Sequence, residues 1–383
     1  MRAGNISILH RNFYGKLLDF FANRNSGSLI ISGEMGYGSL PLTIKALQWK
    51  YCKEIQKSNS REGCQRCHSC RAISSLNHLD VLMIVPAASS LLKKDRYEKI
   101  KEFLIKNPYA EIDDVWDEIY ETASEPQITV EEAELISEFA CKPPALSTSK
   151  TIILWHADHM NTTAANKLLK IIEEPPVPVF FVFLPSNMKK ILPTIISRSV
   201  VLKMFPVPPP IIKDFIIDYE KIDIKDAELV SLISDGNINT AISLIKSDFI
   251  KKMESIREFF ILAYRQQNGE AISKLEDIIN SRREAKEFLK NILIVLRLSW
   301  MAQIHQLPHL SLLNDKLQKF IKGLGETLQL HGIHYLSWKV FKFYLPLLSS
   351  NINIKILLSN FIIDLNRVFK KTEHEFAEES DNL

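Results

Sequence analysis

A glycine-rich loop that follows a short apolar run constrains the fold of this chain more than any other feature of its sequence. Gly33, Gly36 and Gly38 have the spacing of the G-x-x-x-x-G-K-[ST] loop, whose backbone N–H groups cradle phosphates. The lysine and hydroxyl positions of that loop hold Ser39 and Leu40 here, so the cation for the terminal phosphates and the Mg²⁺ ligand are both missing. We therefore expect the fold of a phosphate-binding ATPase in a chain that does not hydrolyse ATP.

The composition around this loop is that of an ordinary globular protein. Hydrophobic residues make up 46% of the 383 residues and charged residues 24%, which is ample for the cores of two or three domains. The 48 basic and 45 acidic side chains leave a net charge of +3, which is too balanced to indicate nucleic-acid binding. No stretch has the length and apolarity of a membrane span, and no apolar leader follows Met1, so we expect a cytoplasmic protein.

Short apolar runs rich in β-branched residues recur in the first half of the chain, and segments with helical spacing lie between them. Strands that alternate with helices predict an α/β fold with a mainly parallel sheet covered on both faces. The clearest helix is expected over Asn161–Glu174, which Pro175-Pro176 would end. The expected strands are Ser28–Ser32, Asp80–Val85, Thr151–Trp155, Val179–Leu184 and Ser199–Leu202.

A proline-rich segment, Pro206–Pro210, marks the end of the strand signal. We expect a sheet domain over residues 1–205, a small helical unit over 206–248 and a larger helical domain over 249–383. Charged residues with helical spacing over 87–125 predict a helical insertion in the sheet domain.

Four of the five cysteines have the spacing C-x₁₁-C-x₂-C-x₂-C and are Cys52, Cys64, Cys67 and Cys70. Two consecutive C-x-x-C steps bring thiolates together on a tight turn, as a tetrahedral Zn²⁺ site requires. Four protein ligands leave no open coordination position, so a module over about residues 52–70 would bind zinc structurally. The alternatives are a set of free thiols, or His68 in place of one thiolate. Cys141 stands apart and is expected to be a small buried hydrophobe.

A second position of a nucleotide site is also altered. The strand expected over Thr151–Trp155 should end in carboxylates that hold Mg²⁺, but it ends in Trp155-His156, and Asp158 follows two residues later. His156 is expected to be a structural residue at the strand end. This loss agrees with the loss at Ser39 and Leu40, because each removes a group that ATP hydrolysis needs.

An arginine precedes the last expected strand. Such an arginine is usually a solvated surface charge, but Ser197-Arg198-Ser199 resembles the Ser-Arg-Cys motif of clamp-loader subunits, with a serine in place of the cysteine. The segment His156–Pro176 is similar to the signature "ADKM…AANALLKxLEEPP" of the same family, and His78–Val81 resembles the "HPD" that follows its zinc module. Near the C-terminus, Asn351–Leu358 resembles its "NVNxxLxLE". The chain is thus similar to the clamp-loader subunits of bacterial DNA polymerase III.

Within this family the gamma/tau subunit keeps the loop lysine and the acidic strand end. The delta-prime subunit often lacks them but retains the arginine motif, and this chain resembles the delta-prime type. The resemblance implies an AAA+ sheet domain over 1–205, a three-helix lid over 206–248 and a helical collar that carries oligomer contacts over 249–383. It also implies a ring of five with gamma/tau and delta, which loads the sliding clamp on primed DNA.

The resemblance assigns roles to individual residues as well. Arg198 would reach in trans the ATP held by a neighbouring subunit, because its planar, permanently charged fork suits γ-phosphate oxygens. ATP would bind only weakly or not at all at the degenerate loop of this chain, and Zn²⁺ would be structural. The lid arginine of the family falls near Asn239 and is missing, and Ser186-Asn187 stand at a vestigial phosphate-sensing position.

Two other functions are compatible with the sequence. One is an active gamma/tau-like ATPase that uses Lys45 in place of the missing lysine. The other is a zinc-dependent nucleic-acid-binding protein outside any clamp loader, for which the basic residues near the cysteines are the support.

Overall fold

The computed structural model describes residues 6–55, 60–87, 93–119, 126–304, 310–345, 347 and 353–370. The chain divides into two compact units. The first comprises Met1–Lys221 with Ser234–Ile242, and the second Ile222–Ile233 with Ser243–Leu383. The sequence predicts three domains, with boundaries after residues 205 and 248. This prediction is finer than the division into two units and remains a prediction. Within the described ranges, no helix is long and apolar enough to cross a membrane.

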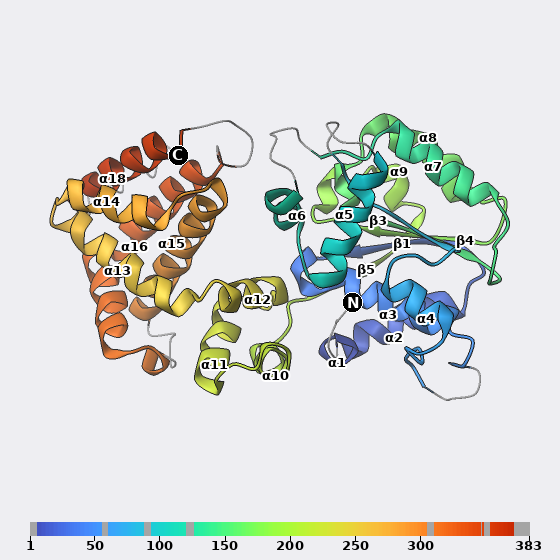
Figure 1. The fold of residues 1–383 in the computed structure, drawn as a ribbon, viewed down its shortest axis with the longest axis horizontal. Coiled ribbons are helices and arrows are strands. Elements are labelled where there is room, and N and C mark those ends of the chain that lie inside the picture. The colour runs from blue at the N-terminus through green and yellow to red at the C-terminus, as the bar shows by residue number, and fades with distance from the viewer. Residues whose placement is uncertain are drawn as a thin grey trace. The chain divides into compact units, whose positions relative to one another are not determined.

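A five-stranded parallel sheet forms the centre of the first unit, as the alternation of strands and helices predicted (Figure 1). The strand order is β2-β3-β4-β1-β5, so β1 lies between β4 and β5, with Ile30 opposite Phe183 on one side and Val201 on the other. Every residue of β3 and β4 is buried, which explains why these strands read as continuous apolar runs. The strands are β1 (Gly27–Ser32), β2 (Val81–Ile84), β3 (Lys150–Trp155), β4 (Val179–Leu184) and β5 (Ser199–Lys203).

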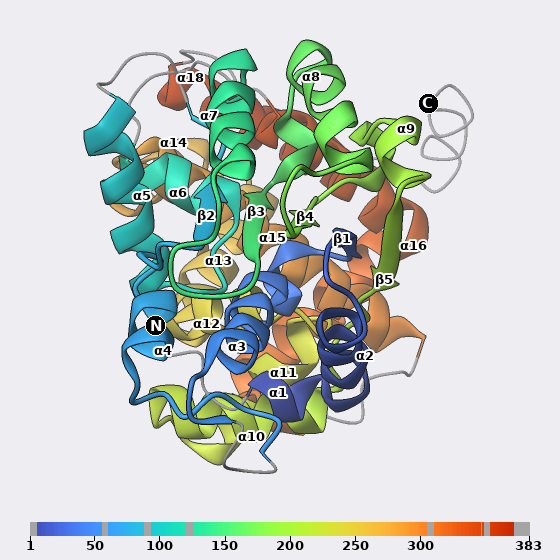
Figure 2. The same cartoon turned by 90° about the vertical axis from the view of Figure 1, so that its right-hand side faces the viewer.

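Helices cover both faces of this sheet (Figure 2). On one face, apolar side chains of α7 (Val130–Cys141), α8 (Thr162–Glu173) and α9 (Pro193–Ile196) share a buried cluster with β-strand residues such as Phe181. On the other face, Phe20 and Phe21 of α2 (Arg11–Ala22) meet Phe180 at ring-centroid distances of 5.8 and 5.3 Å. The side chain of Asn161 caps α8 by accepting a hydrogen bond from the N–H of Ala164, within one residue of the expected helix start.

The remaining helices of the first unit surround the glycine-rich loop and the cysteines. The expected insertion over 87–125 contains two helices, although residues 88–92 and 120–125 lie outside the described ranges. The helices are α1 (Ile6–Leu9), α2 (Arg11–Ala22), α3 (Ser39–Tyr51), α4 (His68–Ser74), α5 (Lys93–Lys106), α6 (Ile112–Ile119) and α10 (Pro209–Glu220). A further helix, α12 (Ile238–Lys246), begins in the first unit and ends in the second.

The second unit is helical in its described part. Phe259 lies at its centre, with Phe288 at 5.5 Å and Phe361 at 6.3 Å between ring centroids. The last described helix therefore contributes to the core of the unit and is not an appendage. The helices are α11 (Ile224–Ile233), α13 (Phe249–Tyr264), α14 (Asn268–Ile278), α15 (Arg282–Gln303), α16 (Asp315–Tyr344), which is kinked at Gln329, and α18 (Ile354–Lys370).

Candidate functional site

The glycine-rich loop leaves the carboxyl end of β1, where open parallel sheets commonly bind ligands. Met35–Tyr37 form a 3₁₀ turn, Gly38 takes the left-handed conformation with φ of 100°, and α3 begins at Ser39. Ser39 and Leu40 are only 3% and 2% exposed, and the Ser39 hydroxyl lies 3.6 Å from the sulfur of Met35. The two positions that would carry the lysine and the Mg²⁺ ligand thus point into the protein.

Side chains of the chain itself occupy the space next to the loop glycines. A methyl group added at Gly38 would lie 2.4 Å from Ile6 and 3.1 Å from the ring of Tyr109. A methyl group added at Gly36 would lie 2.1 Å from Oδ1 of Asn237. We call the space that Ile6, Tyr109 and Asn237 occupy the loop mouth. These three side chains pack directly against the loop glycines.

Lys45, the substitute lysine of the alternative ATPase function, has other contacts. It is 8% exposed, and its Nζ lies 3.5 Å from both the carboxylate of Glu62 and the hydroxyl of Ser7. These contacts direct the ammonium group toward Glu62, which lies between Cys52 and Cys64, and toward α1.

The end of β3 has no free carboxylate. His156 takes the left-handed conformation, is 1% exposed, and both ring nitrogens lack a hydrogen-bond partner among the described residues. Burial is the main reason why the pKa of His156 lies far below its usual value, so the ring is neutral. Asp158 accepts hydrogen bonds from the N–H of Ser186 at 2.9 Å and from its hydroxyl at 2.7 Å. Asp158 and Ser186 therefore join the ends of β3 and β4 to each other.

The structure brings the four expected zinc ligands together. The sulfur atoms of Cys52, Cys64, Cys67 and Cys70 all lie within 4.8 Å of one another. Tetrahedral zinc with Zn–S bonds of about 2.3 Å needs sulfur atoms about 3.8 Å apart, and Cys64 and Cys70 are at 4.0 Å. His68 lies outside this cluster, and Cys141, expected to be buried, is instead exposed as the last residue of α7.

Backbone N–H groups of the turn favour thiolates in this cluster. Cys64 Sγ accepts from the N–H of Cys67 at 3.2 Å, and the N–H groups of Cys67 and Arg66 lower the pKa of Cys64 to about 6. Burial instead raises the pKa of Cys70, whose thiol points to the carbonyl of Gln48 at 3.6 Å. Because metal binding requires thiolates, a bound ion would displace the proton that burial favours there. The donor set and its spacing fit a structural zinc ion.

Arg198 lies on the surface, directly before β5. Its guanidinium pairs with the carboxylate of Glu173 at the end of α8, and it also donates to the carbonyl of Thr194 at 3.0 Å. No sequence motif pairs Glu173 with Arg198, although two acidic residues stand directly before Pro175-Pro176. These contacts hold the guanidinium group in one orientation and leave it exposed to solvent.

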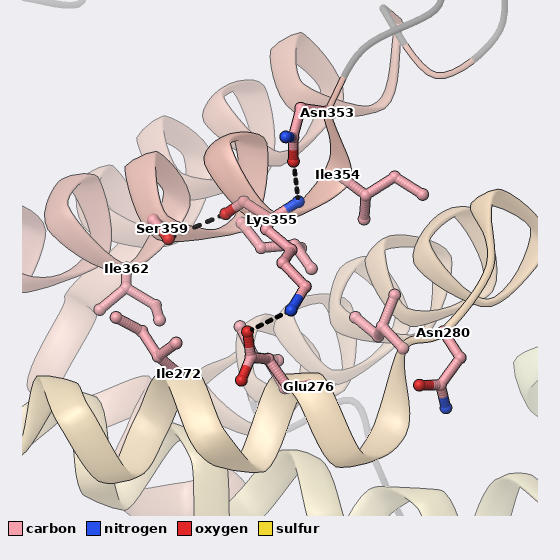
Figure 3. A pocket seen from close by; sticks show the side chains of 11 residues that line it. Ile272, Glu276, Asn280, Asn353, Ile354, Lys355, Ser359 and Ile362 are labelled. Atoms are coloured by element: carbon pink, nitrogen blue, oxygen red, sulfur yellow. Dashed lines mark hydrogen bonds and ion pairs between the residues drawn. The ribbon is translucent and has the colours of Figure 1, made fainter.

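The second unit contains a pocket of about 380 Å³ between α14 and α18 (Figure 3). Ile272 and Ile362 are among its apolar lining residues, and Lys355 pairs with Glu276 at 2.9 Å across it. Its two ionisable groups thus neutralise each other, and we assign no chemistry to it.

Comparisons with known proteins agree with the motifs. The chain matches the family model described as DNA polymerase III, delta subunit, over residues 17–208. The DNA polymerase III subunit delta-prime of Bacillus subtilis (strain 168) is 23% identical over 354 residues, 90% of this chain and 92% of the relative. That of Escherichia coli (strain K12) is 23% identical over 297 residues, 77% of this chain and 73% of the relative.

Among solved structures, a DNA polymerase III gamma subunit-related protein from Thermotoga maritima is similar over 93% of this chain and 99% of its own, with a TM-score of 0.46 and 16% identity. The family resemblance expected from the sequence motifs is confirmed by the family model and the delta-prime relatives. Since the model matches half of the chain, this protein belongs to the DNA polymerase III delta-subunit family.

Proposed function

We propose that this chain is a non-hydrolysing subunit of the DNA polymerase III clamp loader and supplies Arg198 to ATP held by a neighbouring subunit. The observation that carries the proposal is the contrast between two sites of one chain. Arg198 is exposed, whereas the loop that should hold a nucleotide is occupied by Ile6, Tyr109 and Asn237. A phosphate-binding fold that cannot receive phosphate but presents an arginine suits a subunit that completes the site of another.

The pair between Arg198 and Glu173 is compatible with this role. An exposed ion pair contributes about 0–1 kcal/mol, so a polyphosphate can displace the carboxylate at little cost. An arginine finger supplied in trans raises the rate at the site it completes by roughly 10³- to 10⁵-fold. Glu173 would keep the guanidinium oriented until the neighbouring nucleotide arrives.

The partners follow from the family. We infer gamma/tau and delta as neighbours in a hetero-pentameric ring that loads the sliding clamp on primed DNA, because the curated relatives are named as delta-prime subunits of this polymerase. In this assignment residues 206–248 form the lid of an AAA+ fold and residues 249–383 the collar. The zinc ion held by the four cysteines is structural.

Rings rebuilt from this chain with gamma/tau and delta test the proposal. Arg198→Ala should leave the ring assembled but lower clamp-stimulated ATP hydrolysis and clamp loading, although by less than 10³-fold because other sites remain active. Arg198→Lys should restore little activity, because an ammonium group cannot make a bidentate contact. Arg11→Ala removes another exposed arginine, on α2, and serves as the matched control. Full activity of the Arg198→Ala ring would overturn the assignment.

A further inference from the structure

A turn of the helical insertion enters the loop mouth of the same unit. Tyr109 lies between α5 and α6 and is 2% exposed. Its ring lies against Gly38 and meets Phe215 of α10 edge-on, with 5.6 Å between centroids. The insertion thus packs a large buried side chain against the last glycine of the loop.

Asn237 joins three parts of the chain beside this ring. Its Nδ2 lies 3.3 Å from carboxylate oxygens of both Glu34, in the loop, and Glu111, in the insertion. Its Oδ1 accepts from the N–H of Thr240 at 2.9 Å and so caps the start of α12. One buried side-chain amide therefore forms hydrogen bonds to the loop, to the insertion and to the start of α12.

A second hydrogen bond runs parallel to the first. Asn239 Nδ2 donates to Asp114 Oδ2 at 2.9 Å. The same oxygen accepts from the N–H of Glu111 at 2.8 Å, which fixes the start of α6. The two asparagines of residues 234–240 are thus matched to two carboxylates of the insertion.

We propose that residues 107–114 are a built-in substitute for a nucleotide, which fills the loop mouth and fastens residues 234–240 to the loop. Tyr109 supplies the bulk, while Glu111 and Asp114 supply the acceptor oxygens that the asparagines bind. The inference concerns the role of the insertion and stands whether or not Arg198 acts in trans.

The charge of the loop mouth agrees with this assignment. Glu34 and Glu111 place two carboxylates beside Asn237 at the loop, and their negative charges would repel a polyphosphate. Burial, followed by the carboxylates of Glu34 and Asp235, raises the pKa of Tyr37 in the loop. A site built for anions would lower such a pKa.

Hydrogen exchange of the full chain tests the proposal. In Tyr109→Ala we expect the amides of residues 35–42 and 234–242 to exchange at least about tenfold faster, with β3 and β4 unchanged. Tyr109→Phe keeps the ring and should exchange like the wild type. Tyr51→Ala is the matched control, because Tyr51 is also buried in this unit but bonds to Ser149 and Thr151. Equal loosening of residues 234–242 in Tyr109→Ala and Tyr51→Ala would overturn the proposal.

Two further measurements use milder changes. Asn239→Ala and Asp114→Ala should each speed exchange in residues 234–242, and Asn239→Ala should add little in the Asp114→Ala background, because its hydrogen bond is already absent there. Additive effects would show that the two side chains act separately. Mg-ATP at millimolar concentration should leave the exchange of residues 35–42 in the wild type unchanged. Protection of these amides by Mg-ATP would show that the loop mouth is open to nucleotide.

Discussion

At the scale of single residues, the loop glycines have reasons to be glycine that do not involve phosphate. Gly36 leaves room for the side chain of Asn237, and Gly38 combines a positive φ with close contacts to Ile6 and Tyr109. Packing within the chain is therefore enough to require glycine at these two positions of the phosphate-binding pattern. Glycines alone do not show that a loop binds a nucleotide.

Replacement of Gly36 tests this packing argument. Gly36→Ala should lower the free energy of unfolding by about 1–3 kcal/mol, because the new methyl group overlaps the side chain of Asn237. The loss should be smaller in an Asn237→Ala background, where the overlapping atoms are gone. Gly323→Ala is the control, since nothing lies within 4 Å of a methyl group there, and it should not destabilise. Urea unfolding of the four variants measures these differences, and an Asn237-independent loss would contradict the explanation.

Residue-level predictions from the sequence succeeded where a local pattern determined the contact. Cys64, Cys67 and Cys70 cluster because two C-x-x-C steps bring them to one turn, and Lys45 points away from the loop because it lies well along α3. The contacts of Gly36 with Asn237 and of Gly38 with Tyr109 join segments far apart in the chain, and no local pattern encodes them. The expectation that Cys141 is buried was wrong. It is the last residue of α7, where the helix end leaves its side chain in solvent.

At the scale of elements, the five strands lie within two residues of their expected ends. β3 and β4 are buried throughout, so their apolar runs are unbroken and easy to delimit, whereas the edge strand β5 is partly exposed. The turn after α7 could not be predicted in this way. The carboxylate of Asp80, just before β2, holds it by accepting from the N–H groups of Ala145 and Leu146 and from the hydroxyl of Ser147.

Acid should weaken this link between β2 and the turn. Burial alone would raise the pKa of the Asp80 carboxyl, but the three donors, led by the N–H of Ala145, outweigh it and lower the pKa. An unfolded aspartate titrates near about pH 3.9, so the stabilisation is complete above that pH and is lost as pH falls through the lower folded pKa. Asp80→Asn should destabilise the chain at neutral pH and flatten the acid end of its stability profile. Urea unfolding across this pH range measures both effects, with Glu138→Gln, at an exposed position of α7, as the control. A profile of Asp80→Asn parallel to that of the wild type would contradict this explanation.

The cysteine cluster and its turn form the element that we expect to depend most on a bound ion. Metal analysis under reducing conditions should find one zinc ion per chain, and Cys64→Ser should reduce it sharply, whereas Cys141→Ser, at an exposed and separate position, should not. Structural zinc contributes roughly 10–16 kcal/mol of apparent binding free energy, so a chelator should speed hydrogen exchange in residues 60–74. The sheet should be affected less, because its core does not depend on the cysteines. Zinc-free protein with an unchanged module would show that the cysteines are free thiols.

At the scale of the whole molecule, we expect the folded arrangement around the loop, and not only the two substituted positions, to prevent ATP hydrolysis. Ile6, Tyr109 and Asn237 come from an N-terminal helix, the insertion and the segment before α12, and all three meet at the loop. Restoring the missing loop residues would leave these three side chains in place. The sequence alone could identify the two substituted positions. It could not show that side chains fill the loop mouth, because they come from segments far apart in the chain.

The variant Ser39→Lys/Leu40→Thr therefore gives a decisive comparison. It recreates the G-x-x-x-x-G-K-[ST] pattern, yet we expect it to bind no Mg-ATP and to hydrolyse none, like the wild type. A ligand present at about 100 times its dissociation constant would stabilise the chain by about 2.7 kcal/mol, which a thermal-unfolding experiment with Mg-ATP would detect easily. Circular dichroism first establishes that the variant is folded, since both positions are buried, and Ser39→Lys alone provides a less perturbed version. If the restored loop gains nucleotide binding, the two substitutions and not the occupied loop mouth keep this subunit from using ATP.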